Sequence, residues 1–213
     1  MKNLGYYNGV WDEIENMSIP MGDRVCFFGD GIYDATYSRN YTIFSLDEHV
    51  DRFYNSAKLL EIELPYSKTE MKDLLNSMVK KMDTGENFVY FQATRGSSSI
   101  RNHVFPNETK ANIWINIYHK EILDLTKRIQ LITMEDTRFF HCNIKTLNLI
   151  PAVIASQRAK EAGCFESRCH CVSTSQRSWM LRVGFSQERK SHRVCSQQCT
   201  YHKKRYANHS TYR

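Results

Sequence analysis

Proline and glycine are scarce in this chain of 213 residues, with four and nine of each. Such counts exclude collagen-like and low-complexity chains, while 41% hydrophobic residues are enough to bury a core. No segment approaches the roughly 18 uncharged apolar residues of a membrane helix, and the first ten residues lack the apolar stretch of a secretory signal. We therefore expect neither a membrane span nor a signal peptide.

The first part of the chain also lacks the regular cysteine spacing of a disulfide framework. Its cysteines are scattered, at Cys26, Cys142 and Cys164. Disulfide frameworks belong to oxidising compartments. The scattered cysteines therefore fit a reducing environment, and we expect a cytoplasmic protein.

The net charge of +6 is distributed unevenly along the chain. Residues 167–213 contain ten Lys and Arg residues against one acidic residue, whereas residues 1–166 carry a net charge of −3. The same final segment contains no Ile, no Asp, no Pro and a single Leu. We therefore interpret residues 167–213 as an aberrant, disordered basic tail on a mildly acidic folded protein.

Local patterns in residues 1–166 predict both strands and helices. Asn8-Gly9 is a hairpin turn signal, and Ile113, Ile115 and Ile117 alternate with more polar residues as on a half-buried strand. Strands are expected at 24–28, 88–94, 112–118 and 128–134.

Three helices are expected from capping residues and from apolar residues at helical spacing. Ser45 and Ser67 are each followed three positions later by Glu, the spacing of a capping box. Pro151 suits the first turn of a third helix, which should stop at Gly163. Strands and helices in this order predict an α+β fold with an N-terminal domain over residues 1–120.

Lys145 lies among apolar residues just before the third predicted helix. Its stem can lie on apolar surface while its amine reaches water. Alternatively, its amine is desolvated and has the lowered pKa that suits Schiff-base chemistry. Spacing alone favours the first interpretation and leaves the second open.

Two other segments offer cationic side chains. Arg101 and His103 follow a predicted strand in a Ser-rich loop, which is either simply solvated or suited to gripping a carboxylate. Arg52 lies on the first predicted helix, where it either pairs with a nearby acid or binds a phosphate. No residue pattern before residue 167 indicates a metal site.

Six motifs follow one another in residues 1–166. They are Gly29-Asp30-Gly31-Ile32-Tyr33, His49-x-x-Arg52, Thr94-Arg95-Gly96, Arg101-x-His103, Ile144-Lys145-Thr146-Leu147-Asn148-Leu149 and Ala162-Gly163-Cys164-Phe165-Glu166. Taken together, these motifs resemble the class IV pyridoxal-phosphate aminotransferases, and within them the D-amino acid aminotransferases. The likeness covers residues 1–166, and the Arg101-x-His103 pair favours the D-amino acid branch. Branched-chain aminotransferases and aminodeoxychorismate lyases share the fold and the lysine, and remain alternatives.

The resemblance implies roles for five residues. Lys145 holds pyridoxal 5'-phosphate as a Schiff base and moves the proton at the substrate Cα. Arg52 binds the phosphate of the cofactor. Tyr33, Arg101 and His103 grip the substrate α-carboxylate and so present the D-enantiomer to the lysine. The resemblance also implies a homodimer, with Arg101 and His103 serving the partner's site, an amino acid and a 2-oxo acid as substrates, and no nucleic acid as partner.

The tail lacks the segments that follow in this family. There a Thr-Glu pair, whose Glu contacts the pyridine nitrogen of the cofactor, leads to Ser-Asn-Val. When the last two bases of each codon of residues 192–204 are joined to the first base of the next, the permitted codons include TECAHSNVHIIK. We therefore predict that the tail is an out-of-frame product, which reading the coding DNA decides.

The expected organisation is thus a two-domain class IV fold with a complete small domain and a truncated cofactor domain. Residues 1–120 form the small domain, residues 121–166 begin the cofactor domain and residues 167–213 are the tail. We expect weak cofactor binding and little activity. The competing interpretation is a non-enzymatic protein whose tail cysteines and histidines bind zinc or nucleic acid. It is disfavoured because the ligand spacing is irregular and the tail has almost no Leu or Ile to pack around a metal.

Overall fold

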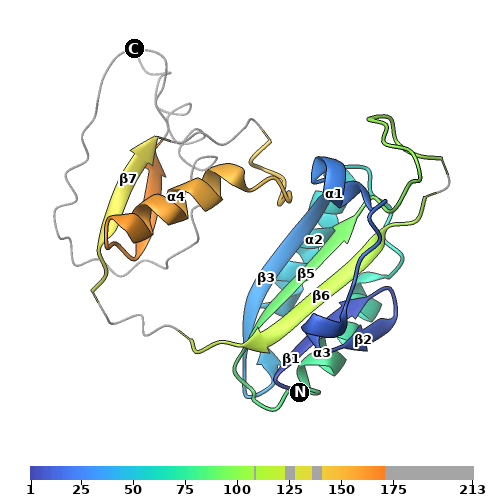
Figure 1. Ribbon diagram of the computed structural model, residues 1–213. Coiled ribbons are helices and arrows are strands. Elements are labelled where there is room, and N and C mark those ends of the chain that lie inside the picture. Colours follow the sequence, from blue (N-terminus) through green and yellow to red (C-terminus); the bar gives the residue numbers. More distant parts are fainter. Residues whose placement is uncertain (108, 123–127, 136–140, 171–213) are drawn as a thin grey trace, which may run out of the picture. The chain divides into compact units, whose positions relative to one another are not determined.

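The computed structural model describes residues 1–107, 109–122, 128–135 and 141–170 (Figure 1). Contacts divide the chain into two units. The first contains Met1–Leu125 and, far along the chain, Ile144–Asn148; the second contains Thr126–Asn143 and Leu149–Arg213. The segment around Lys145 therefore belongs with the N-terminal part of the chain, and the predicted limits at residues 120 and 166 stay predictions.

An antiparallel sheet forms the centre of the first unit. Its six strands lie in the order β2-β1-β6-β5-β3-β4. Asn8 and Gly9 both have positive φ in the turn between β1 and β2, which confirms the predicted hairpin. The strands are β1 (Asn3–Tyr7), β2 (Val10–Asp12), β3 (Gly31–Arg39), β4 (Thr42–Ile43), β5 (Asn87–Thr94) and β6 (Asn112–His119).

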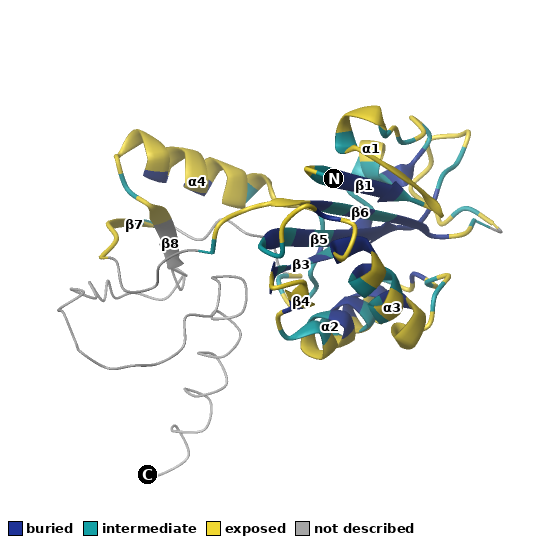
Figure 2. Ribbon diagram, turned by 90° about the horizontal axis from the view of Figure 1, so that it is seen from below, coloured by how far each residue is buried: buried dark blue, intermediate teal, exposed yellow. Residues whose placement is uncertain are grey.

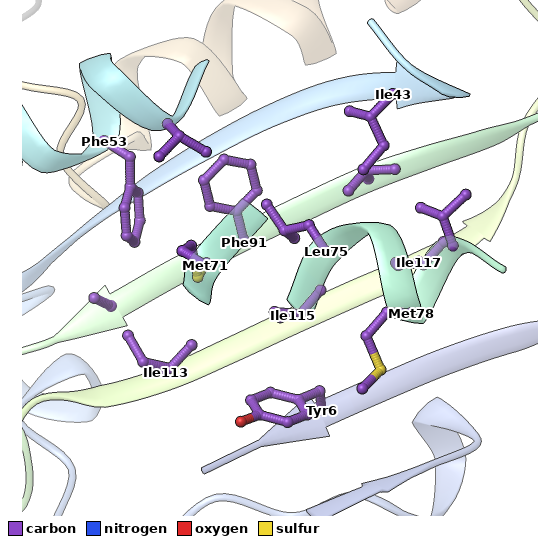
Figure 3. Close-up of a cluster of buried hydrophobic side chains, with 14 of the residues drawn as sticks. Tyr6, Ile43, Phe53, Met71, Leu75, Met78, Phe91, Ile113, Ile115 and Ile117 are labelled. Carbon is purple, nitrogen blue, oxygen red and sulfur yellow. The ribbon is translucent and has the colours of Figure 1, made fainter. Parts of the chain in front are cut away.

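Two helices, α2 (Leu46–Leu59) and α3 (Lys68–Val79), cover one face of this sheet and turn exposed residues outwards (Figure 2). The predicted helical spacing is confirmed, since the apolar positions of both helices point inwards. Ile113, Ile115 and Ile117 of β6 are fully buried beneath them, as their alternation predicts (Figure 3). The sheet with its helices confirms the predicted α+β class.

The two predicted capping boxes have opposite outcomes. At α3, the Ser67 side chain accepts from the Glu70 N–H while the Glu70 carboxylate accepts from the Ser67 N–H, which confirms the prediction. At α2 the prediction is wrong, because Ser45 has φ +46° and its side chain makes no capping hydrogen bond. A capping side chain needs an extended backbone to reach the helix N–H groups. The acidic Asp47 and Glu48 in the first turn favour that helix end instead.

This difference between the two serines predicts a measurable difference in stability. Replacing Ser67 by alanine removes one half of the capping box and is expected to lower the free energy of unfolding by about 1 kcal/mol. Ser45→Ala is the matched control and should change it little, since no capping bond is lost. Chemical denaturation of both variants measures the effect, and equal losses at the two positions would contradict it.

The predicted strand at 24–28 is wrong, because these residues form the short helix α1 (Arg24–Phe28). The carboxylate of Asp23 accepts a hydrogen bond from the Val25 N–H, and Gly29, with φ +59°, ends the helix. A capping residue and a left-handed glycine thus outweigh the strand propensity of Val25 and Phe27. The strand of this region is β3, which begins at Gly31, two residues after Gly29. A 3-10 turn, η1 (Ile14–Asn16), lies earlier in the unit.

The second unit contains β7 (Leu131–Glu135), α4 (Ile150–Glu161) and β8 (Glu166–His170). Pro151 lies in the first turn of α4 and Gly163, with φ +66°, follows its end, so this helix is confirmed. Strand β7 confirms the predicted strand but starts three residues later than predicted. None of the described helices is both long and apolar enough to cross a membrane.

The strand β8 extends past residue 166, where the tail is predicted to begin. Residues 167–170 continue strand β8, which pairs in parallel with β7. Backbone hydrogen bonds to a neighbouring strand do not depend on the identity of the side chains, so this basic segment completes the strand. The prediction of disorder and of a shifted reading frame for residues 171–213 falls outside the described residues.

Candidate functional site

The segment Ile144–Asn148 lies against the beginning of β3 in the first unit. The Tyr33 N–H donates to the Lys145 carbonyl at 2.9 Å, and the Leu147 N–H donates to the Gly31 carbonyl at 3.2 Å. Ile32 and Thr146 form the antiparallel bridge between these bonds. A short antiparallel pairing therefore holds the backbone of Lys145 beside Tyr33, across 112 positions of sequence.

Two small residues permit this close approach. A Cβ on Gly31 would lie 2.5 Å from the Ala93 carbonyl oxygen and 2.8 Å from Cδ1 of Leu147, so only glycine fits at the start of β3. Ser56, fully buried on α2, accepts a hydrogen bond through Oγ from the Lys145 N–H at 3.2 Å. Helix and strand together thus satisfy the backbone around the lysine.

The side-chain amine of Lys145 contacts the phenol of Tyr33. Its Nζ donates to Oη of Tyr33 at 2.9 Å and lies 4.3 Å from the centre of the Tyr33 ring. The ring of Tyr33 stacks on that of Tyr90 at 5.5 Å, which orients the phenol. The structure therefore brings two of the predicted site residues, Lys145 and Tyr33, into direct contact.

Arg52 on α2 is held by a fully buried carboxylate. Asp34 on β3 accepts hydrogen bonds from Nε and Nη2 of Arg52, both at 2.6 Å, and from Nδ1 of His49 at 2.7 Å. Burial alone raises the pKa of Asp34, but the bonds from His49 and Arg52 outweigh burial, so this pKa lies below its ordinary value. The hydrogen bond to Asp34 raises the pKa of Arg52 in turn.

Asp34 is the acid that the pairing interpretation of Arg52 required. The phosphate interpretation also remains open, because Nη1 of Arg52 has no hydrogen-bond partner within the described part of the chain and 31% of the side chain is exposed. Asp34 was missed because the strand β3 was missed. A charged residue between Ile32 and Thr36 on the buried face of a strand requires a cationic partner, and this signal could have identified it.

Arg101 and His103 lie together, in the exposed loop after β5. The Arg101 guanidinium lies 5.0 Å from the ring centre of Phe28, and the His103 ring lies 5.0 Å from that of Phe28. The ring of Phe28, at the end of α1, therefore contacts both residues that were predicted to bind a carboxylate. Their nearest aromatic partner is thus Phe28, whereas Tyr33 contacts Lys145.

The donors of this unit suit an aldehyde that bears a phosphate better than a metal ion. A primary amine on Lys145 can react with a carbonyl group, and a guanidinium with an open Nη1 can bind a phosphate oxygen. Within the described ranges, no three His, Cys, Asp or Glu residues lie close enough to hold a metal. The tail residues of the zinc interpretation, from Cys171 onwards, lie outside those ranges.

Known proteins agree with these motifs over most of the chain. The family model for amino-transferase class IV matches residues 31–172, six residues beyond the predicted end of the resemblance. The D-alanine aminotransferase of Listeria monocytogenes serotype 1/2a (strain 10403S) is 33% identical over 162 residues, covering 74% of this chain and 56% of that protein. That of Bacillus licheniformis is 34% identical over 166 residues, covering 76% and 57%. The chain therefore spans little more than half the length of these relatives.

Solved structures share the fold at lower identity. The branched-chain aminotransferase of the thermophilic archaeon Thermoproteus uzoniensis, solved with norvaline, matches with a TM-score of 0.69 and 14% identity, over 78% of this chain and 59% of that one. The branched-chain enzyme of Escherichia coli matches with a TM-score of 0.66 and 12% identity, over 81% and 59%. These likenesses establish the arrangement of strands and helices.

Proposed function

Because the chain belongs to the class IV aminotransferase family, we propose that it transfers the amino group of a D-amino acid to a 2-oxo acid, with pyridoxal 5'-phosphate held on Lys145. The observation that carries this proposal is the contact of 2.9 Å between Nζ of Lys145 and Oη of Tyr33. This contact supports the proposal because the reaction needs an amine beside a group that can bind a carboxylate.

The donors of the first unit fit the chemical groups of the cofactor. When bound, pyridoxal phosphate supplies an electron-withdrawing ring that stabilises negative charge at the substrate Cα. Arg52 binds the phosphate through Nη1, while Asp34 holds Nε and Nη2 and so fixes the plane of the guanidinium. Lys145 takes the proton from the substrate Cα and returns it, as general base and then as general acid.

The substrate carboxylate is bound by Tyr33, Arg101 and His103. Arg101 offers a planar fork of N–H donors for a carboxylate, and His103 on the same aromatic ring adds a further donor. The D-alanine aminotransferase relatives favour the D-amino acid branch over the branched-chain and lyase alternatives. A homodimer, with these two residues serving the partner's site, and a cytoplasmic location belong to the same proposal.

The experiment is a conversion assay with three amino donors. The full chain is mixed with pyridoxal phosphate, 2-oxoglutarate and either D-alanine, L-alanine or L-leucine, and the new 2-oxo acid is measured. We expect slow conversion that needs added cofactor and is selective for D-alanine. It should be slow because residues 171–213 do not carry the Thr-Glu and Ser-Asn-Val motifs of the family. Preference for L-leucine would support the branched-chain alternative, and conversion that does not need the cofactor would contradict the proposal.

A further inference from the structure

A buried arginine underlies the loop that carries Arg101 and His103. Arg24, the first residue of α1, is 4% exposed, although its guanidinium carries a full charge. Its Nε donates to the carboxylate of Asp30 at 2.7 Å, which balances that charge. An arginine is rarely buried unless it is paired, so the other bonds of Arg24 indicate its role.

The side-chain hydrogen bonds that Nη1 and Nη2 of Arg24 make within the described residues go to one stretch of backbone. Nη1 of Arg24 donates to the carbonyl of Asn102 at 2.7 Å and, more weakly, to that of Val104 at 3.4 Å. Nη2 donates to the carbonyl of His103 at 3.4 Å. A single guanidinium therefore binds three successive carbonyls of a loop that has exposed side chains and no regular secondary structure.

The same arginine also orders the aromatic ring beneath that loop. The Arg24 guanidinium lies 4.8 Å from the ring centre of Phe28, and the same ring receives Arg101 and His103. The helix α1 and the loop after β5 lie at the same end of the sheet (Figure 1). Arg24 thus contacts both the backbone of the loop and the ring on which its two side chains rest.

A second arginine binds the same carboxylate of Asp30. Arg95, also buried, donates through Nε to the same Asp30 carboxylate at 2.9 Å and through Nη1 and Nη2 to the carbonyls of Glu61 and Leu60. Two guanidinium groups therefore share the carboxylate of Asp30, which ties Arg24 to a second buried arginine at the base of the loop.

We propose that Arg24 is a positioning residue, which fixes the backbone of residues 102–104 so that Arg101 and His103 stand together for the substrate α-carboxylate. The carboxylate itself rests on the proposed function, whereas the ordering of the loop does not. Arg24 reaches the substrate only through the loop, and its planar fork suits this task better than the single ammonium group of a lysine.

The first test measures the loop without any substrate. The proton resonances of the His103 ring, assigned with His103→Gln, are shifted by the neighbouring Phe28 ring in the folded chain. In Arg24→Met we expect these resonances to move to their positions in the denatured chain. We also expect trypsin cleavage after Arg101 to become about tenfold faster. Arg24→Lys keeps the charge beside Asp30 and should give an intermediate result.

Two control variants separate positioning from a general loss of stability. Arg39→Met removes an equally charged but exposed residue, paired with Glu86, that is absent from the contacts of the loop. Leu75→Ala destabilises the same unit through its core. Neither should move the His103 resonances of the folded protein. Unchanged resonances and cleavage in both Arg24 variants, or equal changes in Leu75→Ala, would overturn the proposal. If Arg24→Met does not fold, Arg24→Lys decides.

A titration with pyruvate, as the carboxylate probe, separates this proposal from the proposed function. In the wild-type chain we expect pyruvate to shift the His103 resonances, and in Arg24→Lys to require about ten times more pyruvate. A loop that depends on Arg24 but does not respond to pyruvate would contradict the proposed carboxylate site. A pyruvate response that is equal in both proteins would contradict the positioning role of Arg24.

Discussion

Replacing Lys145 by alanine is expected to abolish attachment of pyridoxal phosphate at this position and the conversion of D-alanine with it. Lys145 is partly buried, its amine contacts a phenol, and its backbone is held by pairing with β3. A lysine held beside its partner groups forms a bond with an aldehyde more readily than a freely moving one. Replacing Lys145 should therefore reduce cofactor attachment and D-alanine conversion more than replacing any other single lysine.

This result can be measured even where conversion is slow. The chain is incubated with pyridoxal phosphate and reduced with borohydride, so that each lysine joined to the cofactor is fixed, and the modified peptides are identified by mass spectrometry. We expect at least about tenfold more modification at Lys145 than at exposed lysines, because its backbone and amine are already positioned. Lys58→Ala, an exposed lysine of α2, is the matched control and should leave the pattern unchanged.

Tyr33, which contacts Lys145, allows a more conservative substitution at this site. Tyr33→Phe keeps the ring that stacks on Tyr90 but removes the oxygen that accepts from Nζ. We expect modification at Lys145 to fall without vanishing, because the backbone pairing remains. Equal modification of Lys145 and Lys58 in the wild-type chain would contradict the role of this site.

Replacing Asp34 by asparagine is expected to have the largest effect on stability among the site residues. The carboxylate of Asp34 is fully buried and is the shared acceptor for Arg52 and His49. Asparagine keeps the shape but removes the charge and replaces one acceptor oxygen by a donor. We expect the free energy of unfolding at neutral pH to fall by roughly 2–3 kcal/mol, and phosphate binding by Arg52 to weaken as its guanidinium loses its orientation.

The dependence on pH follows from the direction of the pKa shift. The pKa of Asp34 is lower in the folded chain than in the unfolded chain. Its contribution is therefore fully present above the unfolded value of about 3.9, and it is lost as pH falls through the folded pKa. Denaturation between neutral pH and acid should show a steeper loss of stability for the wild-type chain than for Asp34→Asn.

A control on α2, the helix that carries Arg52, distinguishes burial from charge. Asp51 forms an ion pair with Lys68 at 2.6 Å, but its side chain is 62% exposed. Asp51→Asn should cost little, since solvent screens an exposed pair. Similar losses for Asp51→Asn and Asp34→Asn, or no change in the acid profile of Asp34→Asn, would contradict the role assigned to the buried carboxylate.

The sequence predicted the elements whose signals are local and repeated. The apolar spacing of α2 and α3 and the alternation of Ile113, Ile115 and Ile117 were enough to place them, because each pattern has one buried face. Prediction failed where the signal lay in a few backbone angles. Gly29 ends a helix rather than a strand, and Ser45 has a left-handed conformation that prevents capping.

The prediction of the site was likewise successful in one part and incomplete in another. Motifs along the chain were sufficient to select Lys145, Arg52 and Arg101 as candidates, since a family's motifs are read from residue types in order. The sequence could not supply their partners. Tyr33 lies 112 positions from Lys145, and Arg24 lies 78 positions from the Asn102 carbonyl that it binds.

The family, the α+β class and the residue types available for chemistry follow from the sequence, because these depend on order and periodicity along the chain. Which of these groups lie together became visible only in the folded chain. It joined the lysine to a phenol, Arg52 to the buried Asp34, and Arg24 to the backbone of a distant loop. Hydrogen bonds and ion pairs act over a few ångströms in space, and that distance is set by the pairing of strands and the packing of helices rather than by separation in sequence.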